Sequence, residues 1–252
     1  MADIYLFDVD GTLTPAKSKI VRSFQEAFID WQAGKEVYIV SGGSFVRLID
    51  QLGTTLLDKT SGVFSCMGNA FYQRREQIND SGMSEWVLIY ENKFVAPKNL
   101  TRSLRSYVAK SNYHTKTGNH HELRTGMMNF SVVGRNASVE QRGEYAAYDA
   151  EHAERFRIAS KLKKKYTELD FVIGGAVSID IFYKGNDKSQ IINRYFNEAL
   201  ESNSVHFVGD RIPEPGNDYA LANKLRGHKN GHVYEVETWE DTAELLKTPP
   251  FA

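Results

Sequence analysis

The sequence predicts an α/β fold, in which a doubly wound parallel sheet is interrupted by an inserted α+β domain. Three short apolar runs predict the sheet, namely Ile4–Phe7, Val37–Val40 and Val205–Val208. Each is rich in β-branched or aromatic residues and stops abruptly at polar or glycine residues, as expected of parallel strands buried on both faces. The pattern stops near residue 82 and resumes near 188, so we expect a core of residues 1–82 and 188–252 around an inserted domain of residues 83–187.

The first two runs enclose a predicted helix. Apolar side chains recur at helical spacing between Lys19 and Gly34, and the glycine ends the pattern. Strand, helix and strand in this order form a βαβ unit, from which doubly wound sheets are built. Beyond the third run we expect a helix, a short strand and a closing helix, over Asn217–Leu225, Val233–Val236 and Thr238–Lys247.

The inserted domain has longer helical stretches between alternating strand patterns. Its candidate strands are Trp86–Tyr90, Met127–Val133 and Val177–Phe182. Its candidate helices are Leu100–Lys110 and Val139–Tyr166. Long helices interleaved with alternating strands predict an α+β domain with an antiparallel sheet.

Composition and charge exclude several classes of function. The chain has 252 residues and a formal net charge of -1, so no global field attracts nucleic acid or an anionic membrane. Any anionic ligand must therefore be held by a local group of basic side chains. A lone cysteine, Cys66, cannot form an intramolecular disulfide, and the acidic residues near the start do not fit a signal peptide. Since no apolar run approaches the ~20 residues of a membrane span, we expect a cytoplasmic enzyme.

Acidic residues follow the first predicted strand directly, in the segment Asp8-Val9-Asp10-Gly11-Thr12. Ligands of open α/β sheets bind at the carboxyl ends of the strands, where these two carboxylates lie. One carboxylate can coordinate Mg²⁺ and attack phosphorus, as in aspartyl-phosphate enzymes, and the other can exchange a proton with the entering or leaving oxygen. The alternative is an ordinary solvated Asp-Gly turn.

Three further segments follow predicted strands or the point where the parallel pattern resumes. Ser41-Gly42-Gly43-Ser44 offers a hydroxyl and backbone amides for a phosphate, although such clusters are often simple turns. Lys188 could neutralise the nucleophile and the transferring phosphoryl group, or lie on the surface. Asp210, in Gly209-Asp210, is a second acidic strand end that would complete a metal site with Asp8, and Gly216-Asn217-Asp218 follows it.

The inserted domain contains three arginines around a predicted strand: Arg124, Arg135 and Arg142. Arginine is suited to bidentate recognition of phosphate, although these side chains could instead form surface ion pairs with nearby glutamates. Ser178 and Asp180 alternate with apolar residues, so they share one face of a strand. That face can hydrogen-bond sugar hydroxyls or a phosphate.

The four segments of the core, taken in this order, resemble the haloacid dehalogenase superfamily of phosphotransferases over the whole chain. The resemblance implies a Rossmann-like core, a mobile cap and Mg²⁺. It also implies that Asp8 is the nucleophile and a metal ligand, and that Asp10 is the general acid/base and reaches the metal through its carbonyl. Lys188 would then be the stabilising cation and Asp210 a metal ligand.

The inserted domain resembles the cap of the eukaryotic-type phosphomannomutases. Their pattern R-x-G-M-x-N, then G-R, then an arginine seven residues on, then G-G-x-x-S-x-D, is met at every named position. Thr14-Pro15 and Gln51-Leu52-Gly53 also fit that family. The resemblance implies a set of residues that bind substrate: Lys17, Gly43, Ser44, Arg124, Asn129, Arg135, Arg142, Ser178 and Asp180.

The activity implied by the resemblance is interconversion of mannose 6-phosphate and mannose 1-phosphate, a step of mannose metabolism toward GDP-mannose. A hexose 1,6-bisphosphate activator would phosphorylate Asp8, and the protein would be a homodimer through its cap.

Several positions depart from the family pattern. Lys17 stands where the family has an arginine, Asn186 replaces a tryptophan, and Ser41 replaces an apolar residue, so either Ser41 or Ser44 could contact phosphate. These changes leave two alternatives open, namely glucose phosphates as substrates and a sugar-phosphate phosphatase on the same scaffold.

Overall fold

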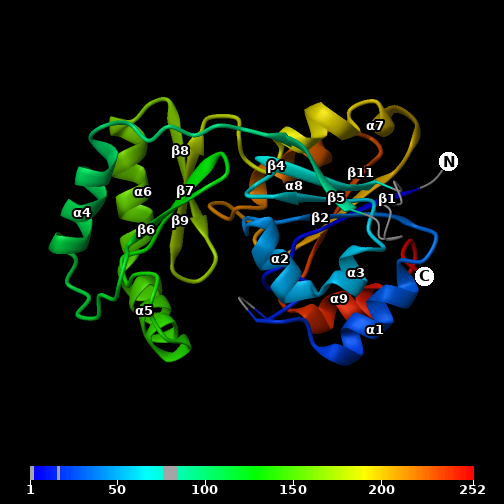
Figure 1. Cartoon of the computed structure of the whole chain (residues 1–252), viewed down its shortest axis with the longest axis horizontal. Helices are drawn as coiled ribbons and strands as arrows, with labels where there is room; N and C mark the ends of the chain where they lie inside the picture. The colour runs from blue at the N-terminus through cyan, green and yellow to red at the C-terminus, as the bar shows by residue number, and fades with distance from the viewer. Residues whose placement is uncertain (1–2, 16–17, 76–84) are drawn as a thin grey trace. The chain divides into compact units, whose positions relative to one another are not determined.

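The structure is a computed structural model that describes residues 3–15, 18–75 and 85–252. It divides into two compact units (Figure 1). The core unit is Met1–Glu91 with Gly185–Ala252, and the inserted unit is Asn92–Lys184. The predicted α/β class is confirmed, because a largely parallel sheet and a separate antiparallel sheet are both present. The boundary expected near residue 82 lies outside the described residues, and the chain re-enters the core unit at Gly185.

Before the insertion, the core unit contains β1 (Ile4–Phe7), α1 (Arg22–Trp31), β2 (Glu36–Val40), α2 (Phe45–Leu52), α3 (Thr54–Leu57), β3 (Gly62–Ser65), β4 (Ala70–Arg75) and β5 (Glu85–Glu91). After it come a π-helical turn η1 (Ile192–Phe196), α7 (Ala199–Ser202), β10 (Val205–Gly209), α8 (Tyr219–Arg226), β11 (Gly231–Glu235) and α9 (Trp239–Leu245).

Within the described residues, the core sheet has seven strands in the order β11-β10-β1-β2-β3-β4-β5. The strands from β11 to β3 pair in parallel, whereas β4 and β5 extend the sheet antiparallel. The central strand β1 places Phe7 opposite Val208 on one side and Ile39 on the other. The carboxyl ends of β1, β10 and β2 therefore lie level, and the segments that follow them meet at one edge.

One strand prediction is wrong in its placement. Trp86–Tyr90, expected in the inserted domain, lies in β5 and pairs with β4 of the core sheet. The alternation of its side chains identifies a strand but does not tell which sheet that strand joins. The prediction also missed β3 and β4, since their short runs lie between turns.

Side chains of β1 alternate between two hydrophobic layers. Tyr5 and Phe7 pack with Phe28 of α1 and Leu48 of α2 on one face. Ile4 and Leu6 pack on the other face, against η1, α7 and α8. Figure 1 shows α1, α2, α3 and α9 on one side of the sheet and α7 and α8 on the other. The core unit is thus doubly wound, as predicted.

The inserted unit contains α4 (Leu100–Lys110), β6 (His121–Arg124), β7 (Met127–Phe130), α5 (Val139–His152), α6 (Glu154–Lys165), β8 (Leu169–Gly174) and β9 (Ser178–Tyr183). Its residues are all described, and its four strands pair antiparallel in the order β6-β7-β9-β8. Leu104 of α4 and Leu162 of α6 are buried in one hydrophobic cluster with strand residues such as Ile181. This arrangement confirms an α+β insertion.

The single helix predicted over Val139–Tyr166 is two helices, because Ala153 between them is left-handed with φ 48°. A side chain stabilises the break: Asp149 accepts a hydrogen bond from the backbone N–H of Arg155 at 2.7 Å, near the start of α6. Side-chain capping of a new helix start stabilises such a break. The charged pattern continues across both helices, so it does not reveal the interruption.

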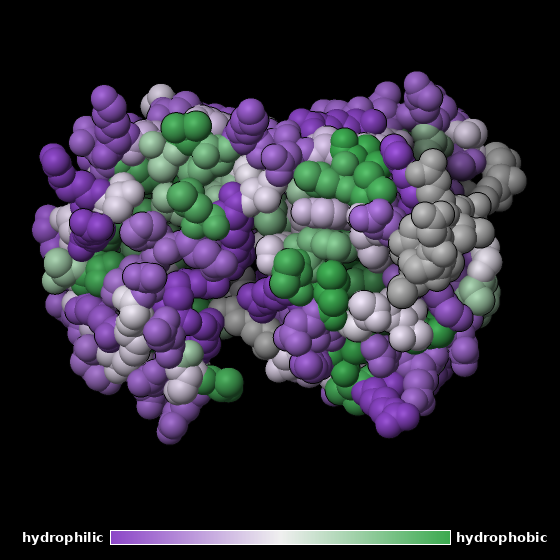
Figure 2. Space-filling model, viewed as in Figure 1, coloured by the Kyte–Doolittle hydropathy of each residue, from purple (hydrophilic) through white to green (hydrophobic). Residues whose placement is uncertain are grey.

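The surface agrees with the composition. Figure 2 shows hydrophilic side chains over much of the visible face of each unit. Among the described residues, none of the helices combines the length and the apolar character needed to span a bilayer.

Candidate active site

The segment after β1 folds into a tight loop. The backbone N–H of Gly11 donates to the carbonyl of Thr14 at 2.8 Å, and Gly11 has φ 90°. Only glycine adopts this conformation readily. A Cβ at Gly11 would lie 2.5 Å from Oδ2 of Asp210, so the glycine also lets Asp210 approach the loop.

Lys188 is fully buried and lies between two carboxylates. Its Nζ donates to Oδ1 of Asp8 at 2.5 Å and to Oδ1 of Asp218 at 2.6 Å. Burial lowers the pKa of Lys188, but Asp218 and Asp8 raise it by more, and the net direction is upward. The ammonium group therefore stays charged beside the predicted nucleophile.

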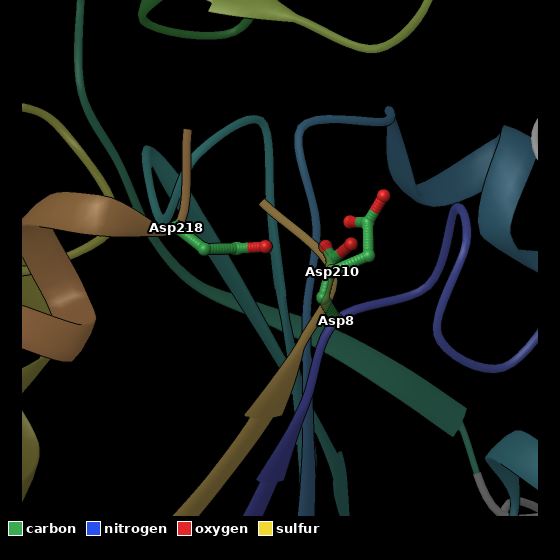
Figure 3. Close-up of side chains that lie close together, drawn as sticks. All are labelled: Asp8, Asp210 and Asp218. Atoms are coloured by element: carbon green, nitrogen blue, oxygen red, sulfur yellow. The ribbon is translucent and has the colours of Figure 1, made fainter. Parts of the chain in front are cut away.

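Asp8, Asp210 and Asp218 form a carboxylate cluster at this edge of the sheet. Each offers one oxygen, and these oxygens all lie within 4.8 Å of one another. Figure 3 shows the three side chains converging from the ends of β1 and β10 and from the residue before α8. The structure thus brings together the predicted Asp8, Lys188 and Asp210, and it adds Asp218.

With all three carboxylates ionised, the cluster would carry more negative than positive charge. Burial raises the pKa of Asp8 well above its ordinary value; Lys188 opposes the rise, while Asp218 and Asp210 add to it. Burial, and then Asp218, raise the pKa of Asp210 to about 7, against Arg211 and Lys188. Three carboxylates around one buried ammonium group thus call for a further cation.

Two buried oxygens also fit a divalent cation. Among the described residues, Oδ1 of Asp210 and Oδ1 of Asn217 are buried without a hydrogen-bond partner. Mg²⁺ takes oxygen ligands and is commonly held by one or two carboxylates plus substrate phosphate. The residues present therefore fit the predicted Mg²⁺, for which Asp8 and Asp210 would be the carboxylate ligands.

Asp10 lies outside the carboxylate cluster. Its Oδ1 accepts a hydrogen bond from Nε2 of Gln51 at 2.9 Å, and its Oδ2 lies 3.5 Å from Arg47. The predicted contact of Asp10 with the metal uses the backbone carbonyl. The side-chain contacts do not test it, so it stays a prediction. A carboxylate held apart from the cluster is suited to move a proton.

The Ser41–Ser44 loop leads from β2 into α2. The hydroxyl of Ser41 is buried and accepts a hydrogen bond from the backbone N–H of Gly43 at 3.1 Å, so it shapes the loop. Ser44 precedes α2 and makes no side-chain capping bond. Of the two hydroxyls left as alternatives, that of Ser44 is the better candidate for a phosphate.

A second turn braces this loop. Cys66 and Met67 both have positive φ, 51° and 63°, and their N–H groups donate to the carbonyls of Gly43 and Ser41 at 2.8 Å each. Left-handed backbone at two residues other than glycine is costly and is held by its surroundings. This brace could not be predicted from the sequence, because neither position is a glycine.

In the inserted unit, neighbouring strands place polar side chains opposite one another. Asn129 of β7 pairs with Asp180 of β9 in the sheet, and its Nδ2 donates to Oδ1 of Asp180 at 2.6 Å. NH1 of Arg135 donates to Oδ1 of Asn129, also at 2.6 Å. Asn129 and Asp180 are both buried, so these bonds fix their orientation. A Cβ at Gly174 would collide with the Asp180 carboxylate.

Glu122 forms ion pairs with two of the predicted arginines. Its carboxylate accepts from NH2 of Arg124 at 2.9 Å and also contacts NH2 of Arg135. Arg142 donates to two backbone carbonyls instead, those of Ala137 at 2.9 Å and Arg135 at 3.0 Å. The three arginines are therefore linked, two through Glu122 and the third through the backbone of Arg135.

Arg155 was not predicted as part of this site. Its guanidinium donates to Asp149 at 2.7 Å, to the carbonyl of Gly175 at 2.8 Å and to that of Ser178 at 3.3 Å. These contacts fix the turn between β8 and β9, from which the predicted Ser178 begins its strand. The predicted Lys17 lies outside the described residues.

The sequence of this chain is similar to those of known enzymes. A family model described as eukaryotic phosphomannomutase matches residues 24–248. A phosphomannomutase of Dendrobium officinale is 35% identical over 246 residues, covering 97% of this chain and 92% of that protein. A phosphomannomutase of Saccharomyces cerevisiae is 31% identical, covering 96% of this chain and 92% of that protein.

Solved structures agree on the fold. A Plasmodium falciparum IMP-nucleotidase superposes with a TM-score of 0.64 at 14% identity, covering 100% of this chain and 71% of that one. A haloacid dehalogenase-like hydrolase from Bacteroides thetaiotaomicron has a TM-score of 0.55 at 14% identity, covering 98% and 99%. These two structures share the haloacid dehalogenase-type fold with this chain. Because the family model and the two relatives match most of its length, the chain belongs to the eukaryotic phosphomannomutase family.

Proposed function

We propose that this protein is a phosphomannomutase that interconverts mannose 6-phosphate and mannose 1-phosphate through a phosphorylated Asp8. The proposal rests above all on Lys188, buried between Asp8 and Asp218 and beside Asp210. A carboxylate that is buried, fixed by an ammonium group and close to a cation site is suited to attack phosphorus. The named relatives support the sugar specificity.

The reaction would proceed in two similar halves. Asp8 attacks a phosphorus of hexose 1,6-bisphosphate, the bond from phosphorus to the sugar oxygen breaks, and Asp10 gives that oxygen its proton. Mannose 1-phosphate then presents its 6-hydroxyl to phosphorylated Asp8, Asp10 removes the proton, and the phosphoryl group leaves Asp8 for this oxygen. The resulting mannose 1,6-bisphosphate binds in the opposite orientation, and the first half is repeated at its 1-phosphate, which releases mannose 6-phosphate and leaves Asp8 phosphorylated. Lys188 neutralises Asp8 throughout, and bound Mg²⁺ would balance the charge of the phosphoryl oxygens.

A mutase must hold the second phosphate while the first reacts. Arg124, Arg135 and Arg142 offer guanidinium groups for this phosphate, and Asn129 with Asp180 offers polar groups for the hexose. The hydrogen bonds that fix Asn129 against both Asp180 and Arg135 support a preformed site. Water must be kept from phosphorylated Asp8, since hydrolysis would end the cycle.

A sugar-phosphate phosphatase is the second candidate, and one observation favours it. The carboxylate of Glu122 pairs with both Arg124 and Arg135, which weakens the attraction of these arginines for a distal phosphate. A phosphatase needs only the Asp8 site and no second phosphate.

Phosphorus NMR separates the two activities. The purified protein is mixed with mannose 1-phosphate, Mg²⁺ and a catalytic amount of glucose 1,6-bisphosphate. We expect the mannose 6-phosphate resonance to grow, and to depend on the bisphosphate. Growth of inorganic phosphate without a 6-phosphate product would reject the mutase and leave the phosphatase.

The family resemblance also motivates a proposed homodimer through the inserted unit. In that unit β6 is an edge strand, and its Leu123 is exposed, which supports a partner at this edge. Light scattering of the purified protein would test it, and a monomeric mass would reject it.

A further inference from the structure

The side chain of Asp10 is held by α2, an element to which the proposed mechanism gives no role. Gln51 is 4% exposed and sits on the inner side of this helix. Its Nε2 donates to Oδ1 of Asp10 at 2.9 Å and to the carbonyl of Ser18 at 3.2 Å. Both amide hydrogens of Gln51 therefore have acceptors, and one of these acceptors is the proposed acid/base.

Arg47 determines which way the amide of Gln51 points. It lies one turn earlier on α2, and its Nε donates to Oε1 of Gln51 at 3.1 Å. A flipped amide would place the NH₂ group against the guanidinium and its oxygen against the carboxylate of Asp10, both unfavourable. Arg47 also approaches Oδ2 of Asp10, at 3.5 Å.

The helix that carries both residues begins directly after the Ser41–Ser44 loop. The loop that is the candidate to contact phosphate and the residues that orient Asp10 are therefore consecutive in the chain. We propose that Gln51 is a positioning residue, which holds the Asp10 carboxyl group in place for proton transfer, and that Arg47 fixes the amide of Gln51. This inference rests on the proposed function, since it assigns Asp10 its proton-transfer role.

The chemistry of the leaving group offers a selective test. When Asp8 takes a phosphoryl group from a sugar phosphate, the bond from phosphorus to the sugar oxygen breaks, and this strongly basic oxygen needs a proton from Asp10. When the donor is 2,4-dinitrophenyl phosphate, the weakly basic dinitrophenolate leaves as an anion and needs no proton. Loss of Asp10 positioning must therefore slow the first reaction and spare the second.

The experiment measures phosphorylation of Asp8 in a single turnover, with Mg²⁺ and the full chain. The two donors are glucose 1,6-bisphosphate, followed by rapid quench, and 2,4-dinitrophenyl phosphate, followed by the burst of dinitrophenolate. The variants are Gln51→Ala, Gln51→Glu, Arg47→Met and the reference Asp10→Asn. Gln51→Glu keeps the size of the side chain and an acceptor for Arg47 but removes the donor to Asp10.

Gln25→Ala is the matched control. The Nε2 of Gln25 donates to the carbonyl of Leu52 at 2.6 Å, so its loss removes one hydrogen bond to the end of the same helix. Gln25 has no hydrogen bond to Asp10 among the described residues. A merely structural effect of loosening α2 would appear in this variant as well.

We expect Gln51→Ala and Gln51→Glu to slow phosphorylation by the bisphosphate by about 30-fold or more, as part of the loss caused by Asp10→Asn. We expect the dinitrophenyl phosphate burst to change by less than about threefold, because no acid is needed. Arg47→Met should show a smaller loss of the same selectivity, and Gln25→Ala no selectivity.

Equal slowing with both donors, or no slowing with either, would overturn the role of Gln51. If Asp10→Asn itself failed to discriminate the donors, the assignment of Asp10 in the proposed function would fall, and this inference with it. A selective Asp10→Asn beside an unselective Gln51→Glu would overturn the inference alone.

Discussion

Nζ of Lys188 lies 2.5 Å from Oδ1 of Asp8, although the two residues are 180 positions apart in the chain. Asp8 directly follows β1, the core's opening strand, and Lys188 follows the return of the chain from the inserted unit. Because both are almost fully buried, neither charge can be compensated by solvent. The contact therefore links the two chain segments of the core unit, and it also balances the charge of the proposed nucleophile.

Lys188→Met should remove both activity and stability. Breaking a buried ion pair at one partner leaves uncompensated carboxylates and costs about 3–5 kcal/mol. Loss of a group that stabilises the transition state should lower kcat by about 10²–10³-fold. Chemical denaturation and the mutase assay measure the two effects, with exposed Lys184→Met as a control that changes neither. A Lys188→Met protein as stable and active as the parent would contradict the charge balance described here.

The stability of the metal-free protein should fall as the pH rises from about 4 to about 7. The pKa of Asp210 is raised from 3.8 to about 7 in the fold, so across this window the folded state binds a proton that the unfolded state has lost. The stabilisation from Asp210 is thus complete at acid pH and disappears above its folded pKa. Urea unfolding in EDTA would measure the slope, and Asp210→Asn should flatten it. An equal slope in that variant would refute the assignment.

Added Mg²⁺ should raise the melting temperature, and more at pH 8 than at pH 5.5. Carboxylates bind metal in their ionised form, and the cluster is more fully ionised at the higher pH. Thermal melts across a Mg²⁺ titration measure the effect, since binding to the folded state alone stabilises it by mass action. Asp210→Asn should lose most of the shift. A shift independent of pH and of Asp210 would place the ion elsewhere.

Arg135→Ala should separate mutase from hydrolytic activity. Arg135 holds Asn129 and pairs with Glu122, so its loss removes a phosphate ligand and disturbs its neighbours. A charge-assisted contact of this kind contributes about 1.5–3 kcal/mol, which corresponds to roughly 10- to 150-fold in kcat/KM. Hydrolysis of 4-nitrophenyl phosphate, which has no second phosphate, should change little. Equal losses in both assays would contradict the division of roles.

Ala153→Gly should stabilise the protein by up to about 1 kcal/mol. Ala153 joins α5 to α6 in a left-handed conformation, which costs an alanine about 1–2 kcal/mol and a glycine very little. Ala150→Gly, at an exposed position inside α5, is the matched control and should destabilise by about 1 kcal/mol. Urea midpoints measure both, and destabilisation by Ala153→Gly would argue against the break between the helices.

The sequence predicted those parts of the site that follow strands. Asp8 and Asp210 come directly after apolar runs, and parallel strands bring such ends to one edge of a sheet. The segment Gly216-Asn217-Asp218 does not by itself predict a role for Asp218, because the place of Asp218 beside Lys188 depends on the start of α8. The sequence identifies Gln51 only as part of a family motif, Gln51-Leu52-Gly53. Its contact with Asp10 depends on the packing of α2, which a single sequence does not specify.

In the inserted unit too, the sequence predicts single side chains but not their partners. Alternation placed Ser178 and Asp180 on one strand face, and the spacing of the arginines marked a polar region. The pairing of Asn129 with Asp180 depends on strand register, and no local pattern sets the partner of β7. Glu122 and Arg155 were missed, since a charged residue on a short strand or helix resembles an ordinary surface residue until its neighbours are known.

The most direct test of the central claim is to locate the phosphoryl group on the protein. The chain is mixed with glucose 1,6-bisphosphate and Mg²⁺, quenched in acid, digested and examined by mass spectrometry. The account predicts the added mass of one phosphoryl group on the peptide containing Asp8, and none in the Asp8→Asn variant, which should also have no turnover. An unmodified Asp8 peptide with the phosphoryl group on another residue, or an active Asp8→Asn variant, would contradict it.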